Sequence, residues 1–529
     1  MKKYIKTLKF ALVFGTIVGL ASCSEEFLNR PPEDNYSVDT FYNTDQQLEA
    51  ATNGLYGKIW FNYHNKAFYA IGEIASGNGF SYSSDVNSLK ELNANGGDPE
   101  IANAWMSCWA VVAQSNALIN LLPERIGSGV SEAAYTKTMG ELKFMRALAY
   151  FYIVRLWGPV PIIENNLEFI NRPEFPSNRV EDVYTFIEND LQFAIENLPA
   201  KMRGSNYADN AHVSKGSAKA ILAKVYLTQN KYAQARAMAE EVINSGEFKL
   251  YGGTQLPAKS YGDLFLTSND NNEESIMAFQ WTNGAYGTGN SCNTQFAYSS
   301  YINENTYGGV FAPSQDLMTI FETGDIRRKE TYMLPGDFYP NITTADGPGL
   351  TVPNNIDAQV SGAGLKKYVV GKVSQSAGPM GSNGMMANNT YVMRYADLLL
   401  IHAEAILGDA ASTSDSQALS SLNAVRNRAG LGNKVSFTKD EILHERRVEL
   451  AYEGEYWFDL CRIPRAKAIA MVQAQNRGDK NFAVYLTGVT ESDFVLPYPS
   501  GEVIKNPMLA QPPVPYNFCL LYTSDAADE

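Results

Sequence analysis

The sequence predicts a mainly α-helical protein, in which paired helices form a scaffold that carries an irregular, loop-rich lobe. Two observations lead to this fold class. Apolar residues recur at helical spacing through most of residues 101–245 and again at 392–428. Between these stretches, residues 251–390 are rich in Gly, Asn, Ser and Tyr and contain few helical runs. Long loops on a rigid scaffold often carry binding function, so we expect it in this lobe.

The composition is that of an ordinary globular chain, with 529 residues of which 45% are hydrophobic and 19% charged. The formal net charge is -14. This acidic balance argues against a nucleic-acid partner, because neutralising phosphates requires a basic face. Aromatic residues make up 12% of the chain, with 31 Tyr, 25 Phe and 6 Trp. Such abundance suits sugar-stacking surfaces, although most of the rings should serve the core.

The N-terminus has the pattern of an export signal. Lysines in the first nine residues precede an apolar run at residues 10–20, which is too short to span a bilayer as a permanent helix. The run ends in Leu-Ala-Ser-Cys at residues 20–23, the pattern of a lipoprotein cleavage site. We therefore expect residues 1–22 to be removed and Cys23 to carry lipid. Ser24, Glu25 and Glu26 follow directly and resemble the surface-export signal of some lipoproteins, which implies an outer-membrane location with the tethered chain facing the extracellular side.

The chain divides into five predicted segments. A polar stretch with two prolines follows Cys23 and has the composition of a tether. The last dozen or so residues match nothing before them, so we treat them, with Cys519, as a possible artefact. Cys108 and Cys461 lie in apolar helical contexts and are expected to be free thiols. The segments are a signal peptide at 1–22, a lipidated tether at 23–43, an N-terminal helical region at 44–250, a loop-rich lobe with the C-terminal region at 251–516, and the anomalous tail at 517–529.

Helices can be assigned along the chain by apolar periodicity and by start and stop residues. The segment between the first two predicted helices, residues 61–99, lacks sustained periodicity and is expected to be a long loop. Short strands are expected at 275–281 and 365–371. The predicted helices run from Thr44 towards Trp60, from Ile101 to Leu122 with Pro123 as the stop, from Ala133 to Trp157, from Val180 to Leu198, from Ser214 to Thr228 and from Lys231 to Asn244.

The last two of these helices form the clearest repeat. Ala223, Tyr226, Tyr232 and Ala235 fall at the spacing of a tetratricopeptide unit, in which small residues let two helices approach closely. A second pair at 392–428 is similar but has a longer linker. The 34-residue period of such units is not sustained, so the scaffold is predicted to be a degenerate tetratricopeptide-like repeat rather than a pure solenoid.

No catalytic constellation stands out, and the protein is predicted not to be an enzyme. Glu445, Glu449 and Glu453 recur at four-residue intervals among arginines, a spacing that favours helix ion pairs over glycosidase chemistry. The four histidines have no metal-ligand spacing, so neither a metal nor another cofactor is predicted. A calcium ion in the acidic loop 268–274 is left as a minor alternative.

Several segments resemble one family. Residues 146–152 (RALAYFY) and 157–161 (WGPVP), and residues 391–404 (YVMRYADLLLIHAE), are similar to two hallmarks of the SusD/RagB family of nutrient-binding outer-membrane lipoproteins. Residues 445–460 (ERRVELAYEGEYWFDL) resemble the third and most specific hallmark. Residues 496–499 (LPYP) and 506–509 (NPML) resemble the closing segment, although the end of the chain departs from the family pattern.

The resemblance covers essentially the whole predicted mature chain and implies a function. Members act as lipid-anchored lids on SusC-like, TonB-dependent outer-membrane transporters, and most bind oligosaccharides, while a minority handle peptides. The expected function is therefore capture of a glycan nutrient and its delivery to such a transporter. An exported glycoside hydrolase and a tetratricopeptide-type adaptor that binds only protein remain alternatives. Because the family's ligand residues lie in variable loops, none can be transferred by motif.

The expected ligand platform consists of aromatic rings in two polar loops, since a ring offers a flat partner to the C–H face of a sugar. Rings in glycine-rich loops are expected to be more exposed than rings in helices. Asn303 and Asn305 accompany the second group. The first group is Phe80 and Tyr82 with Asp85, Asn93 and Asn95, and with Trp105 at the start of its helix; the second is Trp281, Tyr286, Tyr298, Tyr301 and Tyr307.

Overall fold

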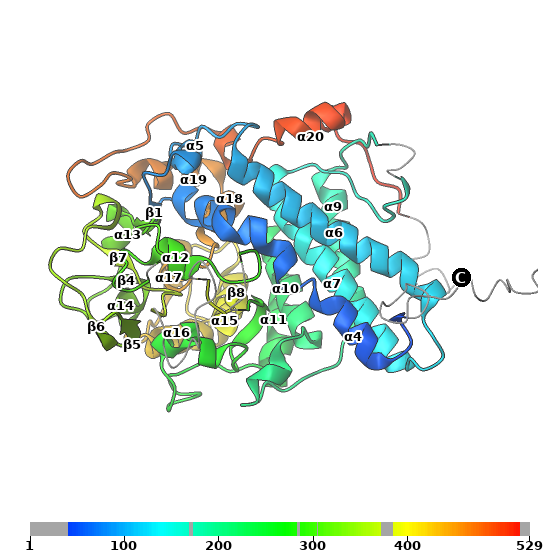
Figure 1. Cartoon of the computed structure of the whole chain (residues 1–529), viewed down its shortest axis with the longest axis horizontal. Helices are drawn as coiled ribbons and strands as arrows, with labels where there is room; N and C mark the ends of the chain where they lie inside the picture. The colour runs from blue at the N-terminus through cyan, green and yellow to red at the C-terminus, as the bar shows by residue number, and fades with distance from the viewer. Residues whose placement is uncertain (1–40, 169–172, 283–285, 304, 372–384, 519–529) are drawn as a thin grey trace, which may run out of the picture.

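The computed structural model describes residues 41–168, 173–282, 286–303, 305–371 and 385–518. Long helices occupy one half of the molecule, and short strands and irregular loops occupy the other half (Figure 1). Cys23, the signal peptide and all but residues 41–43 of the tether lie outside the described residues, as does Cys519. The predicted fold class, a helical scaffold with a loop-rich lobe, is confirmed.

Three long helices form the centre of the helical half: α6 (Pro99–Arg125), α7 (Glu132–Trp157) and α9 (Val180–Asn197). Helix α7 is buried from residue 138 to 154 on every side, because α6 and α9 pack against it and its sequence there is mostly apolar, with the charges of Glu141, Lys143 and Arg146 paired. Its first turn is capped by the Ser131 hydroxyl, which accepts from the Ala134 amide at 3.1 Å. Gly158 ends it with φ of 72°.

The predicted helix pair is present as α10 (Lys215–Thr228) and α11 (Tyr232–Ser245). Ala223 and Ala235 are fully buried where the two helices meet, as the tetratricopeptide spacing predicts. Helix α15 (Tyr395–Leu407) packs against α11 and against α16 (Ser416–Arg428), so the second pair extends the first. The scaffold is therefore a short stack of helical pairs, in agreement with the degenerate repeat.

Two boundary predictions were wrong. The first helix, α4 (Asp45–Asn53), begins after the Thr44 cap as expected but ends before Gly54 rather than running to Trp60. Pro123 does not stop α6, which continues for two more residues to Arg125. A proline in the last turn removes one backbone N–H bond, and the apolar packing of the helix tolerates that loss.

The segment 61–99 is not the long loop expected from its lack of periodicity. It contains two helical turns at Tyr63–Ala67 and Ala70–Ala75, which are wider than an α-helix and lie inside the core. Because neighbours surround these turns on all sides, their apolar residues need no single face, and the periodic signal disappears. The segment ends with β1 (Gly79–Phe80) and α5 (Asn87–Lys90).

The irregular lobe contains only short strands, which form two-stranded antiparallel sheets within the described residues. Strand β2 (Ser275–Phe279) pairs with β8 (Thr390–Arg394), which confirms the expected strand near 275–281 apart from its last two residues. The strand expected at 365–371 is reduced to β7 (Gly364–Leu365), because Tyr368 adopts φ of 64°. The other strands are β3 (Ala312–Pro313), β4 (Tyr332–Met333), β5 (Phe338–Thr344), β6 (Gly347–Thr351), β9 (Ser412–Thr413) and β10 (Phe437–Thr438).

Short helices complete the two halves. Helices α12 (Cys292–Phe296), α13 (Gln315–Met318) and α14 (Arg327–Thr331) lie in the irregular lobe. Helices α17 (Lys439–Glu449), α18 (Tyr456–Arg462) and α19 (Arg465–Ala474) follow the second helical pair, and α20 (Ser500–Lys505) lies near the end of the described chain. One hydrophobic core includes residues from both halves.

The charged hallmark around α17 forms a buried ion network that joins separate elements. Arg394, which is fully buried, donates to Glu274 at 2.5 Å, to Glu449 at 3.0 Å and to Glu453 at 2.7 Å. Arg327 donates to Glu445 at 2.6 Å. The predicted ion-pair role of these carboxylates is confirmed, but the expected pairing along one helix is wrong, because their partners come from β8, α14 and other segments.

Candidate functional site

Two aromatic residues expected on the platform are buried in the core. Trp281 is 5% exposed; its Nε1 donates to the Thr390 hydroxyl at 3.2 Å and its ring lies 4.6 Å from that of His64. Phe80, in β1, is 4% exposed. The expected exposure is therefore wrong for both, because each immediately adjoins or belongs to a short strand whose side chains face the core.

Trp105 also faces inwards. Its ring packs edge-on against Trp157 at 5.0 Å and lies 6.0 Å from Tyr498. It lines a pocket of about 480 Å³ together with Trp109 and residues of α20. Tyr298 is half-buried, and burial raises the pKa of its hydroxyl to about 12. Neither Trp105 nor Tyr298 is as exposed to solvent as the other tyrosines of the two loops.

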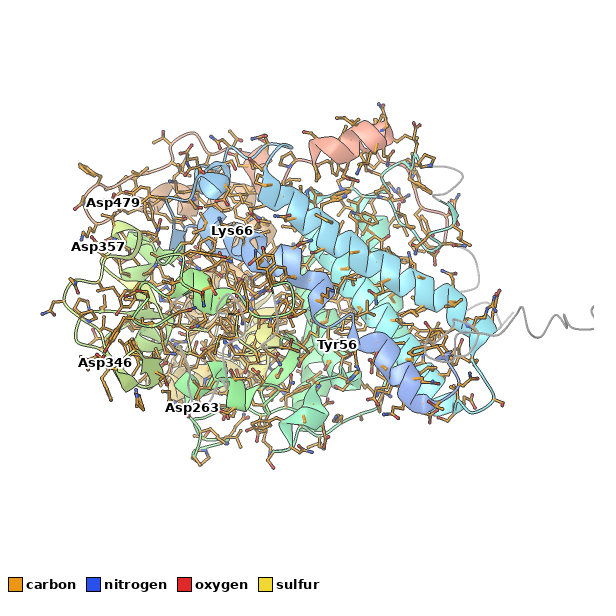
Figure 2. The ribbon with its side chains drawn as sticks, in the orientation of Figure 1. Tyr56, Lys66, Asp263, Asp346, Asp357 and Asp479 are labelled. Carbon is orange, nitrogen blue, oxygen red and sulfur yellow. The ribbon has the colours of Figure 1, made fainter. Side chains whose placement is uncertain are left out.

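Four tyrosines of the two loops are exposed, as expected, with exposed fractions of 51% for Tyr82, 56% for Tyr286, 39% for Tyr301 and 59% for Tyr307. Tyr301 is held apart from the first loop, because its hydroxyl donates to Asp346 at 2.7 Å. Asp346 lies lower on the left edge of the molecule than Asp479 (Figure 2).

Tyr82 and Tyr286 are linked through two consecutive residues of the turn Tyr63–Ala67. Asn65 donates from Nδ2 to the Tyr286 hydroxyl at 3.2 Å, and Lys66 donates to the Ser83 hydroxyl at 3.1 Å, next to Tyr82. The turn thus holds one loop on each side. We refer to the rings of Tyr82, Tyr286 and Tyr307, with Asn65 and Lys66, as the tyrosine face.

Tyr307 belongs to the same face as Tyr286. Burial raises the pKa of Tyr286, and the proximity of Tyr307 raises it further. The Tyr307 amide donates to the Thr294 carbonyl at 3.0 Å in the segment that includes α12. The backbone of Asn65 is in turn held by the Ser291 hydroxyl, which donates to its carbonyl at 3.1 Å. The second loop and the turn are therefore fixed to the same short helix.

Charged groups lie between the rings. Asp85 accepts hydrogen bonds from Lys66 and from the Ser83 hydroxyl, and these donors outweigh burial and lower its pKa. Glu100, at the start of α6, is buried, and this burial raises its pKa. Lys66 is labelled near the upper centre of the molecule (Figure 2). The arrangement combines flat rings with oxygen and nitrogen groups that can hydrogen-bond a polar ligand.

On its other side, Tyr82 contacts two distant segments. Its hydroxyl donates to Asp479, and its amide donates to the Gln359 side chain at 2.7 Å. Asp357 and Lys480 join the same two segments by an ion pair of 2.9 Å. Asp357 and Asp479 lie near each other at the upper left of the molecule (Figure 2). Three separate segments of the chain thus set the position of the Tyr82 ring.

The asparagines expected as polar companions have mainly structural partners. Asn95 accepts from the Gly97 amide at 2.9 Å and shapes the turn before α6. Asn93 donates to Glu91 at 3.3 Å and lines a separate pocket of about 430 Å³ with Trp457. Asn303 is buried and donates to the Asn293 carbonyl at 3.1 Å, whereas Asn305 is exposed. None of these contacts connects an asparagine to the tyrosine face.

Sequence reasoning missed Asn65, Lys66 and Glu100. The first two lie in a segment that was expected to be loop, and their positions depend on the wide helical turn. Glu100 follows the proline that opens α6, a position where an acidic residue is common for reasons of helix capping. No pattern in the sequence distinguishes any of the three from ordinary surface residues.

Comparison with known proteins decides the family. A model described as the SusD family matches residues 241–515, and a second, described as starch-binding and associating with the outer membrane, matches residues 26–227. A SusD-like protein of Bacteroides ovatus is 34% identical over 98% of this chain and all of its own length. The chain belongs to the SusD family. SusD-family proteins are non-catalytic glycan-binding proteins associated with the outer membrane, so the prediction of a non-enzymatic protein is confirmed.

Solved structures agree with this SusD-family assignment. A structure that contains a xylogluco-oligosaccharide has a TM-score of 0.78 and 31% identity, covering 89% of this chain and 99% of its own. A laminarin-binding SusD-like protein has a TM-score of 0.69 and 28% identity, covering 88% and 98%. Among sequence relatives, starch-binding protein SusD of Bacteroides thetaiotaomicron is 29% identical over 28% of this chain and 25% of its own length.

Two further findings concern the SusD-family chain itself. None of its helices, in the part that the structure describes, is long and apolar enough to cross a membrane. Over the same residues, no group of three or more His, Cys, Asp or Glu side chains is arranged to hold a metal ion. In the loop 268–274, where calcium was an alternative, the Glu274 carboxylate pairs with Arg394 and Arg428 at 2.5 Å each.

Proposed function

We propose that this SusD-family protein is a surface-exposed, lipid-anchored receptor that binds oligosaccharide on the tyrosine face and delivers it to a TonB-dependent transporter. The observation that carries the proposal is a group of three exposed tyrosines: Tyr286 is bonded to Asn65, Tyr82 adjoins Ser83, which is bonded to Lys66, and Tyr307 is near Tyr286. Large exposed apolar patches rimmed by polar groups often mark binding sites on folded proteins.

The chemistry of the face suits a sugar. Each ring can pack on the C–H face of a pyranose, and such aromatic contacts contribute roughly 0.5–1.5 kcal/mol beyond the buried area. Lys66, Asp85 and Asn65 can exchange hydrogen bonds with hydroxyl groups at the ring edges. Two or three rings with a few hydrogen bonds correspond to dissociation constants on the order of millimolar to micromolar. That range permits both capture and release.

The position of the chain ends is compatible with a tether. Tyr42, at the start of the described chain, accepts from the Gly127 amide at 2.8 Å beyond the end of α6. Helix α4, near the start of the described chain, lies at the lower right in Figure 1, whereas Asp479, which binds Tyr82, lies at the upper left in Figure 2. A lipid on Cys23 would then hold the protein at one end and leave the tyrosine face free. The relatives that bind xylogluco-oligosaccharide and laminarin support a β-linked glucan as a first candidate ligand.

Two experiments separate this function from its alternatives. Isothermal titration calorimetry of the mature chain against a panel of neutral and acidic oligosaccharides should detect one ligand class, and chromatography should find no cleavage products. Cleavage would favour a hydrolase. Mild solubilisation of outer membranes should recover the protein with a large barrel-forming transporter. Transporter binding without binding of any glycan would favour the protein-binding adaptor, and recovery of the chain alone would contradict delivery to a transporter.

A further inference from the structure

Arg477 differs from the other buried cations of the protein. It is 4% exposed and, among the buried arginines and lysines of the described chain, it alone has no carboxylate oxygen within 4.0 Å. A buried charge without a partner is costly, so native proteins normally pair it. The others, each with a carboxylate in that range, are Lys143, Arg146, Arg203, Lys224, Arg327, Lys366, Lys367, Arg394, Arg426, Arg428 and Arg446.

The contacts of Arg477 are with uncharged oxygens. Its Nη2 donates to the Ala75 carbonyl at 2.5 Å, its Nη1 to the Lys90 carbonyl at 3.0 Å and its Nε to the Gln475 side chain at 3.2 Å. Burial lowers the pKa of Arg477 to about 10. These bonds fix the guanidinium but do not neutralise it. One N–H of Nη1 has no partner among them.

Arg477 lines a pocket that opens beside the tyrosine face. The pocket has a volume of about 320 Å³, at the lower end of the range of ligand pockets, roughly 300–1,000 Å³. Phe80 and Phe482 supply apolar wall, and Tyr82, whose ring is half exposed, belongs both to the pocket and to the tyrosine face. An apolar wall strengthens electrostatic attraction inside the pocket. A glycan lying on the tyrosine face could therefore place one sugar residue or its substituent there.

A second cation lies in the same pocket. The Lys90 ammonium is 5.4 Å from the centre of the Phe80 ring and 5.6 Å from that of Tyr82. It donates to the Ser81 carbonyl at 3.3 Å, and no carboxylate of the described residues lies within 4.0 Å of it. Its position on the pocket wall, close to Tyr82, gives a ligand direct access to a positive charge.

The two carboxylates of the pocket, Glu91 and Asp479, form no ion pair with these cations. Asp479 accepts from the Tyr82 hydroxyl and from the backbone amides of Asn481 at 2.7 Å and Phe482 at 3.0 Å. The Tyr82 bond is the largest of the effects that lower the pKa of Asp479. Glu91 accepts from Asn93, outside the pocket wall, at 3.3 Å. Both acids keep their charge, but their hydrogen bonds go to neutral donors, and neither carboxylate lies within 4.0 Å of a Lys90 or Arg477 nitrogen.

We propose that this pocket binds an anionic substituent of the glycan, a carboxylate or a sulfate ester, through Lys90 and Arg477. Arginine forms paired, charge-assisted hydrogen bonds with such groups, and lysine adds a mobile positive charge. The inference rests on the proposed glycan function and defines the ligand class more narrowly, as an acidic oligosaccharide. The neutral rings of the tyrosine face bind the backbone, and the pocket discriminates by charge.

The test uses matched ligands with the full mature chain. Laminarihexaose and a xyloglucan heptasaccharide are each prepared in three forms: unmodified, oxidised at C6 to the uronate, and sulfated at C6. Binding is measured by calorimetry at low and at moderate salt for the wild type and for Lys90→Ala, Arg477→Gln and Lys505→Ala. Lys505 is 73% exposed at its side chain and lies on α20, so Lys505→Ala controls for the loss of one positive charge. Circular dichroism checks folding.

We expect at least one anionic form to bind about tenfold or more tightly than its neutral counterpart, with a preference that weakens as salt rises. The preference should fall to within about twofold in Lys90→Ala and be retained in Lys505→Ala. If Arg477→Gln does not fold, Lys90→Ala and the salt series still show whether the preference for the anionic form depends on the pocket cations. The uronate and sulfate forms show which anion is preferred. Equal binding of all three forms overturns the proposed anion-binding pocket but leaves glycan binding intact. No binding by any form overturns the inference and also counts against the proposed function.

Discussion

The side-chain amide of Asn65 donates a 3.2 Å hydrogen bond to the hydroxyl of Tyr286, across 221 residues of sequence. This bond holds an exposed ring in one orientation on a surface where an unrestrained side chain would be mobile. The Tyr286 ring also packs edge-on against Phe61 at 4.8 Å. A pre-positioned ring loses less conformational entropy when a ligand binds, which raises affinity without a new contact.

This relationship predicts different effects for two substitutions of Tyr286. Tyr286→Ala removes the ring and should weaken glycan binding roughly tenfold, or ~1.4 kcal/mol. Tyr286→Phe keeps the ring and loses only the bond to Asn65, so binding should stay within about threefold of the wild type. Calorimetry with the ligand found in the panel checks both values. A loss for Tyr286→Phe as large as that for Tyr286→Ala would show that the ring face is not what the ligand uses.

Trp281 should act on stability rather than directly on the ligand. Replacing a buried tryptophan by alanine costs about 3–5 kcal/mol, and Trp281→Ala also removes the bond to Thr390. Urea denaturation should therefore show a large fall in the free energy of unfolding. The exposed Tyr301 supplies the comparison: Tyr301→Ala should cost about 1 kcal/mol or less. Equal stabilities for the two variants would contradict the core position of Trp281.

A second group of buried charges, in which Glu404 pairs with Arg462 and Lys439, predicts an acid-dependent loss of stability. Burial alone would raise the pKa of Glu404, but Arg462 and Lys439 outweigh it and lower the pKa from 4.5 to about 2. Because the folded pKa is depressed, the stabilisation is present above pH 4.5 and is lost progressively as the pH falls towards 2. Unfolding free energies measured between pH 7 and the lowest pH at which the protein still folds should decline through this window.

Glu404→Gln should remove part of that decline. The substitution removes the paired hydrogen bonds of Arg462 to a carboxylate and leaves it with Asp459 at 2.9 Å, so a cost of about 3 kcal/mol at pH 7 is expected. Glu502→Gln, which disturbs only the exposed pair with Lys505, should change stability by less than about 1 kcal/mol. If the pH profile of Glu404→Gln is parallel to that of the wild type, other carboxylates account for the acid sensitivity.

The anchor prediction concerns a residue outside the described part of the chain. Cys23→Ala should abolish lipid attachment and processing at residue 22, so the protein should leave the outer-membrane fraction and keep a larger peptide mass. Membrane fractionation with intact-mass measurement tests this. A variant that remains in the membrane fraction with the wild-type mass would refute the lipid anchor.

Elements with local sequence signals could be predicted, whereas elements that depend on tertiary contacts could not. Helices α7, α10 and α11 were predicted nearly to the residue, because long apolar periodicity and capping residues are local signals. The turn Tyr63–Ala67 was missed, because a segment buried on all sides has no polar face to create periodicity. The pairing of Arg394 with Glu449 was not predictable in detail, since it depends on contacts between distant segments.

The candidate site illustrates the same limit. Trp281 and Tyr286 are five residues apart in one polar, glycine-containing stretch, yet one is 5% and the other 56% exposed. Composition cannot separate them, because the difference arises from the pairing of β2 with β8, after which Trp281 turns towards His64. Loop composition therefore selected segments that carry exposed rings, while tertiary packing determined which rings remained open to solvent.

The most direct test of the central claim is a calorimetric titration of the Tyr82→Ala/Tyr286→Ala/Tyr307→Ala variant beside the wild type, with the oligosaccharide that the wild type binds. All three rings are exposed, so circular dichroism and thermal unfolding should show a folded protein. The proposed function predicts a loss of affinity of at least about 100-fold, from three aromatic contacts of ~1 kcal/mol or more each. A folded variant that binds the oligosaccharide with unchanged affinity would contradict the tyrosine face as the glycan site.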